Sequence, residues 1–386
     1  MRFLDSTIGT LLKPIDRRWF QSVVDRHNAD AYDKSFKSWD HLVVLIVAQL
    51  GGIDGLRGLE TAFNANAHHH YHLRVGRLAR STLSDANVRR PAAVFAEVFT
   101  SLSQTADRQM RREAAEMVRL IDASPIPLSK LCSWAKWNGR IRGMKMHVVY
   151  DPTIDCPRCV EVTDATVNDI EIGRRTEIEA GTTYVFDKGY YHFGWWKKIN
   201  DTGAFFVTRT KVNTRLRAIK HRPLRKRKGD GFTVIADDEV VLTSKGDSRL
   251  PIPLRRIKIR RDRGGTITLL TNDLARTAVE IAALYKGRWQ IELLFRWIKQ
   301  HLDIRKFLGT NDNAIRLQIL AAMIAFLLLR IAAHLHRLMI PALRLVELVR
   351  QRLFMRMPIA EIDKPPPVNP SKPKPKSPNQ LGFCYA

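Results

Sequence analysis

The stretch from Tyr285 to Lys299 constrains this chain most, because its polar side chains recur at helical spacing. At about 100° per residue, Tyr285, Arg288, Glu292 and Lys299 fall within a sector of roughly 60°. The neighbouring face is apolar, which predicts the side that packs against a core. This face consists of Leu284, Ile291, Leu294, Phe295, Ile298 and Leu302. One helix is therefore expected to bury one side and to present a carboxylate between cations on the other.

The limits of this helix can be predicted from its flanks. Thr277 and Glu280 have the spacing of a capping box, so we expect a helix over about residues 278–301. Gly287 lies inside it and is the point at which the helix kinks or splits. In either case the four polar side chains, here called the polar stripe, remain on one side of the helical segment.

Spacing alone leaves two interpretations of the stripe open. Arg288 and Glu292 also fit an ordinary i, i+4 ion pair on a solvated helix. The complete pattern Tyr-x-x-Arg-x-x-x-Glu followed seven residues later by Lys, however, resembles the signature of one group of insertion-sequence DDE transposases, the "IS four" group. Trp289 and the pair Gln290-Ile291 also resemble that family.

The charge of the chain points to a polyanionic partner. Its 386 residues contain 64 Lys and Arg against 38 Asp and Glu, a formal net charge of +26 that favours phosphate contacts. Nucleic acid is the expected partner; a ribosome-like basic protein and an anionic membrane surface are the alternatives. The longest apolar runs, 42–50 and 319–329, fall short of the ~20 residues of a membrane span. Residues 1–5 lack the apolar core of a signal peptide, so we expect a cytoplasmic, nucleoid-associated protein without a membrane partner.

Two further clusters could bind metal. Cys156-Pro-Arg-Cys159 has a zinc or redox spacing but lacks a second such pair, and we interpret it as a hairpin turn. The histidines between His68 and His72 are interpreted as an exposed polar turn.

The first part of the chain, residues 1–110, predicts an all-helical domain. Helices are expected from Ser38 to Leu50, from Ile53 to Phe63 and from Ser81 to Arg90, with a break at Gly51-Gly52. Short helices with tight turns fit a helix-turn-helix-like module that binds the DNA ends. Its basic face would consist of Arg74, Arg77, Arg80, Arg89 and Arg90.

Residues 117–305 change to a strand pattern with carboxylates at strand ends. One apolar run ends on Asp122 and another on Asp187. Further strands are expected over 144–150, 160–166, 203–209 and 266–271. Strands followed by a late acidic helix predict a mixed α/β, ribonuclease-H-like catalytic core.

Three other segments complete the predicted organisation. Residues 212–265 are rich in Arg and Lys and predict an inserted β domain with a basic rim; a solvated charged loop is the alternative. Residues 306–360 predict C-terminal helices, and residues 361–386 a disordered, basic, Pro-rich tail.

The resemblance implies a catalytic role for three acids. Asp122, Asp187 and Glu292 correspond to the acids of the family and would bind two Mg²⁺ ions, with Mn²⁺ as a substitute. Tyr285, Arg288, Lys299 and Trp289 would bind the DNA at the transposon end. Four other carboxylates near predicted strand ends compete for a catalytic role. They are Asp151, Asp155, Asp164 and Asp169.

The implied activity is cut-and-paste transposition by a dimer acting on terminal inverted repeats and target DNA. The alternatives are a catalytically inactive, basic DNA-binding protein and a metal-dependent nuclease without strand transfer. One departure concerns the inserted domain, where some relatives carry a tryptophan that stacks on a flipped base. Residues 212–265 contain no tryptophan, so Trp289 and Phe232 are the aromatic side chains that could replace it.

Overall fold

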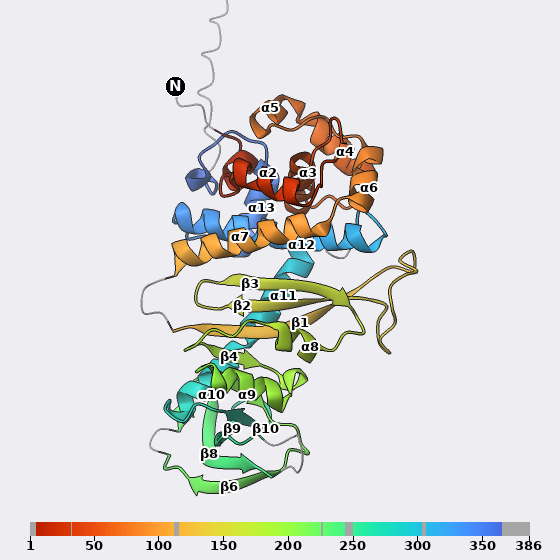
Figure 1. Cartoon of the computed structure of the whole chain (residues 1–386). Coiled ribbons are helices and arrows are strands. Elements are labelled where there is room, and N and C mark those ends of the chain that lie inside the picture. Colours follow the sequence, from red (N-terminus) through yellow and green to blue (C-terminus); the bar gives the residue numbers. More distant parts are fainter. Residues whose placement is uncertain are drawn as a thin grey trace, which may run out of the picture.

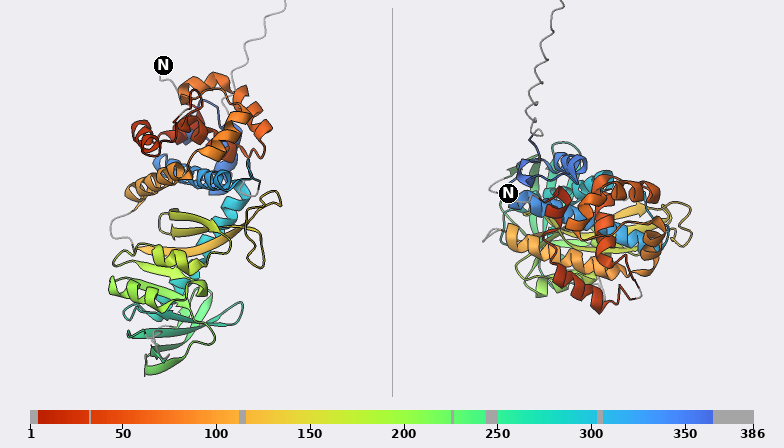
Figure 2. Two further views of the ribbon diagram at one scale, coloured as in Figure 1. Left: turned by 45° about the vertical axis from the view of Figure 1, so that its right-hand side comes forward. Right: turned by 90° about the horizontal axis from the view of Figure 1, so that it is seen from above.

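The chain has three tiers, as seen in the computed structural model (Figure 1). A layer of helices lies at one end, the core of a mixed sheet lies in the middle, and the inserted strands form the other end. The left view of Figure 2 shows the same stacking from another direction. The described residues are 5–31, 33–111, 116–224, 227–243, 250–302 and 306–364.

One sheet runs through the two lower tiers, in the order β3-β2-β1-β4-β5-β10-β9-β8-β6, with β7 paired to β8. Neighbouring strands β1, β4 and β5 are parallel, and the other pairs are antiparallel. The core strands are β1 (Val118–Pro127), β2 (Gly143–Asp151), β3 (Cys156–Asp164), β4 (Thr183–Phe186), β5 (Phe205–Arg209) and β10 (Thr266–Thr271). The inserted strands are β6 (Leu216–His221), β7 (Lys228–Gly229), β8 (Phe232–Leu242) and β9 (Leu254–Arg261).

This arrangement agrees with the predicted fold class, a mixed α/β, ribonuclease-H-like core between helical segments. The inserted strands do not form a sheet of their own, because β9 pairs along the whole of β10 and extends the core sheet. β1 also continues five residues past Asp122, so this acid lies inside the strand and not at its end.

Helices cover both faces of the core sheet. On one face, α8 (Asp169–Arg175), η2 (Lys188–Tyr190) and α9 (Phe193–Asp201) pack around Phe186 and Phe206. On the other face, α10 (Ala278–Gly287) and α11 (Trp289–His301) follow β10, and α11 crosses behind β1 towards the helical layer (Figure 1). Leu120 of β1 belongs to this second face. Because side chains alternate along a strand, Asp122 points the same way as Leu120.

The predicted helix at the signature is split in two. Thr277 and Glu280 form the expected capping box at the start of α10, with the backbone N–H of Thr277 donating to Glu280 at 2.7 Å. The helix is interrupted at Arg288, directly after Gly287, and α11 begins at Trp289.

The two ends of the chain form the helical layer together. α12 (Asp312–Leu335) packs against α3 (Ser38–Gly51) and α7 (Ala92–Met110), and its residues share one hydrophobic core with theirs. The N-terminal helices are α1 (Thr7–Leu12), α2 (Arg17–Arg26), α3 (Ser38–Gly51), α4 (Leu56–Ala65), η1 (Ala67–His69), α5 (His70–Leu73), α6 (Arg80–Arg89) and α7 (Ala92–Met110). The C-terminal ones are α12 (Asp312–Leu335), α13 (Ala342–Arg352) and η4 (Ile359–Glu361).

The predicted N-terminal helices differ from the observed ones mainly at their starts. α3 begins at Ser38 as predicted, and Asp40 completes its cap by accepting from the backbone N–H of Lys37 at 3.0 Å. The break after α3 is real, and Gly52 adopts a left-handed φ of 66° there. α4 begins at Leu56, later than expected.

By length and composition α12 is apolar enough to cross a membrane, but 89% of its most apolar window is buried within the protein. Its position is that of a central core helix. The predicted C-terminal tail lies outside the described residues from residue 365 on.

Candidate active site

The first two predicted acids lie next to each other because their strands are paired in parallel. Ile121 of β1 is the register partner of Phe186 of β4, so Asp122 and Asp187 each follow by one residue on adjacent strands. The Oδ1 atom of Asp122 accepts from the N–H of Ala123 at 2.9 Å. Asp187 ends its strand and caps η2, where its side chain accepts from a backbone N–H.

Arg288 connects Glu292, the third predicted acid, to Asp122. Arg288 lies at the break between α10 and α11, and its guanidinium forks between two carboxylates. Its Nη1 lies 3.0 Å from Oδ2 of Asp122, and its Nη2 lies 2.5 Å from Oε1 of Glu292. The three side chains are between 16% and 31% exposed, so the cluster is partly screened from water but still open.

The surroundings of Asp122 change the pKa of its carboxyl. Burial raises the pKa of its carboxyl to about 6, and the negative charges of Asp187 and Glu292 act in the same direction. Arg288 and the N–H of Ala123 oppose the rise. The three predicted acids therefore share one electrostatic field, and a positive charge placed among them is stabilised.

Lys299 lies further along α11 and binds the edge of β1. Its Nζ donates to Oγ of Ser124 and to the carbonyl of Pro125, both at 2.7 Å. The signature lysine thus ties α11 to the strand that carries Asp122. Ser124 was not singled out from the sequence, because nothing in its local pattern indicates a partner far along the chain.

The two signature aromatics line a cavity of about 490 Å³ between the helix break and the inserted strands. Tyr285 is buried, and burial is the main cause that raises the pKa of its hydroxyl. Trp289 is 49% exposed, and the guanidinium of Arg296 lies 5.7 Å from its ring centroid. The lining includes Arg209, Phe232, Arg261, Tyr285, Arg288 and Trp289. Arg209 is a cation that the sequence pattern did not reveal, since it joins the site only through strand pairing.

The donor set of the site fits a hard divalent cation. Carboxylate oxygens are the ligands that Mg²⁺ prefers, and Asp122, Asp187 and Glu292 lie close enough for the charges of the other two acids to act on Asp122. Within the described part of the chain, no three His, Cys, Asp or Glu side chains lie close enough to hold a metal ion. Arg288 binds both Asp122 and Glu292 and keeps these two carboxylates paired with its guanidinium.

The four competing carboxylates each have another partner, which gives them a structural explanation. Asp151 is fully buried and binds a buried arginine in β1, an arrangement typical of a structural ion pair. The partners are Arg119 for Asp151 at 2.7 Å, Lys145 for Asp169 at 2.9 Å, Lys136 for Asp164 at 3.1 Å and Arg330 for Asp155 at 3.2 Å.

The cysteine pair and the histidines form no metal group in the described ranges. The interpretation of Cys156 and Cys159 as a hairpin turn was wrong, because both lie in β3 and the turn precedes them. The histidines between His68 and His72 lie in η1 and α5, and His70 is buried with its Nε2 at 3.0 Å from the carbonyl of Phe63.

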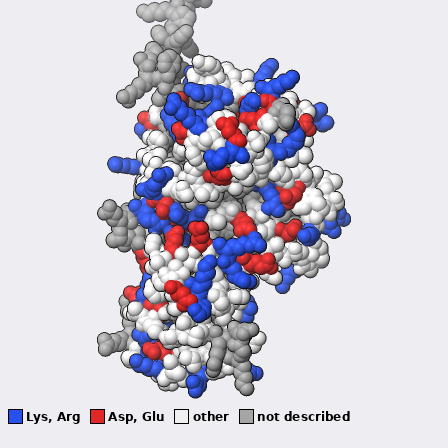
Figure 3. Space-filling model, viewed as in Figure 1, with Lys and Arg blue, Asp and Glu red and all other residues white. Residues whose placement is uncertain are grey.

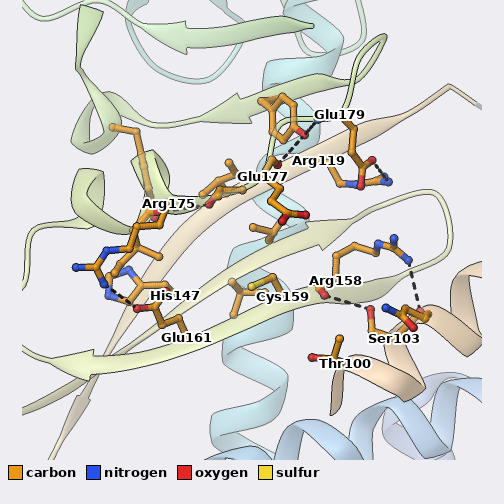
Figure 4. A pocket seen from close by; sticks show the side chains of 18 residues that line it. Thr100, Ser103, Arg119, His147, Arg158, Cys159, Glu161, Arg175, Glu177 and Glu179 are labelled. Atoms are coloured by element: carbon orange, nitrogen blue, oxygen red, sulfur yellow. Dashed lines mark hydrogen bonds and ion pairs between the residues drawn. The ribbon is translucent and has the colours of Figure 1, made fainter. Parts of the chain in front are cut away.

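A second cavity, of about 310 Å³, is lined by residues of α7, β1, β2 and β3 (Figure 4). Cys159 lines it, and its charged side chains are largely paired with one another. Arg119 lies 3.0 Å from Glu179, and Arg175 lies 3.2 Å from Glu161. None of the three predicted catalytic acids is among its lining residues.

Comparison with known proteins identifies the family. Residues 113–328 match the Transposase DDE domain, and residues 5–75 match a domain of unknown function (DUF4372). The chain is 64% identical over 304 residues to "Putative transposase y4zB" of Sinorhizobium fredii, covering 78% of this chain and 85% of that protein. It is 29% identical over 254 residues to "Probable transposase for insertion sequence element IS5377" of Geobacillus stearothermophilus, covering 65% and 66%.

Two further similarities are more distant. "Putative transposase for insertion sequence element IS4SA" of a Synechocystis strain is 25% identical over 260 residues, covering 65% of this chain and 71% of that protein. Among solved structures, the cryo-EM structure of the piggyBac transposase synaptic complex with hairpin DNA superposes with a TM-score of 0.47 at 9% identity, covering 94% and 79%. On the family match and the relative that is 64% identical, the chain belongs to the DDE transposases of insertion sequences, of the IS4 type.

Proposed function

We propose that this transposase cuts DNA at the ends of its element and joins them to target DNA, acting as a dimer that holds two ends. The observation that carries the proposal is the strand register that sets Asp122 beside Asp187, with Glu292 brought to the same point through Arg288. Membership of the family supports the class of reaction.

Asp122, Asp187 and Glu292 would hold two Mg²⁺ ions, for which Mn²⁺ could substitute. When bound, such ions activate an attacking oxygen and stabilise the charge on a leaving oxygen. In the first step, water attacks the phosphodiester at the element end; a P–O bond breaks and leaves a 3′-OH. In the second step, this 3′-OH attacks a target phosphodiester and releases a 3′-OH of the target strand.

The cations and aromatics of the signature would position the DNA. The planar fork of Arg288 suits a phosphate as well as a carboxylate, so a scissile-end phosphate would compete with Asp122 and Glu292 for it. Lys299 would add a point charge at the other end of α11. Tyr285 and Trp289 line a cavity with arginines, which is an environment suited to a nucleotide.

The remaining organisation is proposed on charge and position. Residues 1–110 would recognise the terminal inverted repeats and residues 117–305 would carry out catalysis, in the cytoplasm and in association with the nucleoid. Lys and Arg side chains are spread over the visible face from the helical layer to the inserted strands (Figure 3). The net charge of +26 supports contact with a long polyanion along this whole face.

Neutral, isosteric substitutions test the catalytic assignment. Asp122→Asn, Asp187→Asn and Glu292→Gln should each abolish Mg²⁺-dependent cleavage of a duplex spanning an element end, while the affinity for that duplex changes little. Asp164→Asn is the control, since its carboxylate binds Lys136 away from the site. Retained cleavage in two of the three variants would refute the assignment.

The products separate this function from its alternatives. Joining of cut ends to a supercoiled target plasmid is expected for a transposase. A metal-dependent nuclease would cleave without joining, and a catalytically inactive DNA-binding protein would bind the duplex without cleaving it.

A further inference from the structure

The connection between β1 and β2 is a projecting arm, residues 128–142. It leaves the sheet after Pro127, extends beyond the ends of the neighbouring strands and returns at Gly143 (Figures 1 and 2). Its sequence contains four cations and no Asp or Glu. The cations are Lys130, Lys136, Arg140 and Arg142. An arm of this composition carries a local positive charge away from the body of the protein.

The arm has a defined conformation, because its turn and its base are both tied down. At the turn, Oδ1 of Asn138 accepts from the N–H groups of Arg140 at 3.0 Å and Ile141 at 2.9 Å. Gly139 has a φ of +90°, which favours glycine. At the base, the indole N–H of Trp134 donates to the carbonyl of Thr310 at 2.6 Å. A partner that binds this arm therefore pays little ordering entropy.

The arm exposes an aromatic ring beside cations. Trp137 is 59% exposed, whereas Trp195 and Trp196 in the core are 2% and 0% exposed. The side chains of Lys130 and Arg140 are exposed and make no hydrogen bond or ion pair with any other described residue. Lys136 is paired with Asp164, so Lys130 and Arg140 are the cations that an arm with an exposed indole can offer to a partner. A nucleic acid fits this combination, because its phosphates attract the cations and its sugars and bases contact the ring.

The arm is rigidly connected to the proposed catalytic acid. Asp122 lies six residues before Leu128, the first residue after β1, so the base of the arm is about 20 Å from the acid at ~3.3 Å per residue and the rest of the arm projects beyond it. That length spans roughly six base pairs at ~3.4 Å each. Lys299 binds Ser124 and Pro125 between the two points, so a cation lies on the path from the acid to the arm.

We propose that the arm binds duplex DNA about six base pairs from the scissile phosphate, with Lys130 and Arg140 on phosphates and Trp137 against the groove. This inference rests on the proposed cleavage at Asp122. A second copy of the chain is the less suitable partner, because a chain with a net charge of +26 repels the basic arm of another copy.

Full-length variants test the arm with a fluorescent duplex that extends well past the cut on both sides. Trp137→Ala should weaken binding about tenfold, and Lys130→Ala with Arg140→Ala should lower the slope of log affinity against log salt by about two. Lys198→Ala, in α9 on the opposite face of the sheet, is the matched charge control and should lower it less. Equal melting temperatures exclude misfolding, and Trp137→Phe should keep most of the affinity.

Truncated duplexes locate the contact. Shortening the DNA to about three base pairs beyond the cut on one side should remove the difference between wild type and Trp137→Ala, and the side at which this happens identifies element or flanking DNA. No difference on any duplex would overturn the proposal, as would variants that change only the oligomeric state without DNA. If catalysis is correctly assigned, Asp187→Asn binds the duplex but does not cut it. Cleavage by Asp187→Asn would contradict the catalytic assignment, whereas unchanged binding by Trp137→Ala would contradict the DNA contact of the arm.

Discussion

Lys299 has two possible roles at the scale of the single residue. Its ammonium binds Ser124 and Pro125 and so joins α11 to β1. In the proposed function, this ammonium also binds a DNA phosphate at the scissile end. A structural tie and a phosphate contact differ in their dependence on salt, because only the second releases counterions from DNA.

Lys299→Ala should lower the slope of log affinity against log salt by about one, and should reduce cleavage. Ser124→Ala is the matched control, because it removes one partner of the ammonium and keeps its charge. Binding titrations between low and moderate salt, with both variants beside wild type, make the comparison. Parallel log-log lines for Lys299→Ala and wild type would contradict the phosphate role and leave the tie as the explanation.

Single residues of the site were predictable where the local pattern carries the information. An apolar run before Asp122 and another before Asp187 mark strands, and the helical spacing marks the stripe around Glu292. The fork of Arg288 onto Asp122 was not predictable, since it joins residues far apart in the chain. The i, i+4 pair of Arg288 and Glu292 is present in the structure, and the same guanidinium also binds Asp122.

A buried ion pair connects the inserted strands to the start of the signature helices. Arg255 of β9 is 2% exposed and donates through Nε and Nη2 to the two oxygens of Asp237 of β8, both at 2.7 Å. Its Nη1 also donates to the carbonyl of Arg276, just before α10. The pair therefore holds the inserted strands β8 and β9 next to the start of α10, the helix that carries Tyr285.

Asp237→Ala should lower the free energy of unfolding by about 3–5 kcal/mol, because it leaves the buried guanidinium of Arg255 without its counter-charge. Asp201→Ala is the control. Its pair with Lys197 is half exposed, so its loss should cost less than about 1 kcal/mol. Urea unfolding of the three proteins gives the comparison, and similar midpoints for both variants would contradict this account of Arg255.

The sequence predicted the type of the secondary-structure elements better than their boundaries. The strands and the capping box of α10 appear where they were expected, but β1 runs on to Pro127. Ser124, Pro125 and Pro127 are weak strand formers, and only pairing with β2 makes them a strand. In the same way, charge and turns set residues 212–265 apart in the sequence, whereas the pairing of β9 with β10 merges them with the core sheet.

At the scale of the whole molecule, the helical layer is made from both ends of the chain. Residues of α12 share a core with α3 and α7, although about 200 residues of chain separate α12 from α7 and about 260 separate it from α3. Sequence patterns show that each segment is apolar on one side, but not that they cover each other. The predicted ranges 1–110 and 306–360 therefore meet in one packed body.

Deletion of residues 1–110 should expose the apolar surface of α12, most of which is buried in the full chain. The fragment from Arg111 onward is expected to aggregate and to melt without a cooperative transition. Co-expression with residues 1–110 as a separate chain should restore a soluble complex. A fragment that melts cooperatively alone would contradict the shared core, and recognition of DNA ends is better tested by substitutions of Arg74 and Arg77 in the full chain.

The shared core also orders events during synthesis. Met110 leaves the ribosome about 200 residues before Asp312, the start of α12. At ~5–20 residues per second, the N-terminal helices wait roughly 10–40 s for the helix that completes their packing. A nascent chain that stops early in this interval cannot finish the layer and is a substrate for proteases. We therefore expect premature termination to yield no stable N-terminal fragment, because the surface that α12 covers stays exposed.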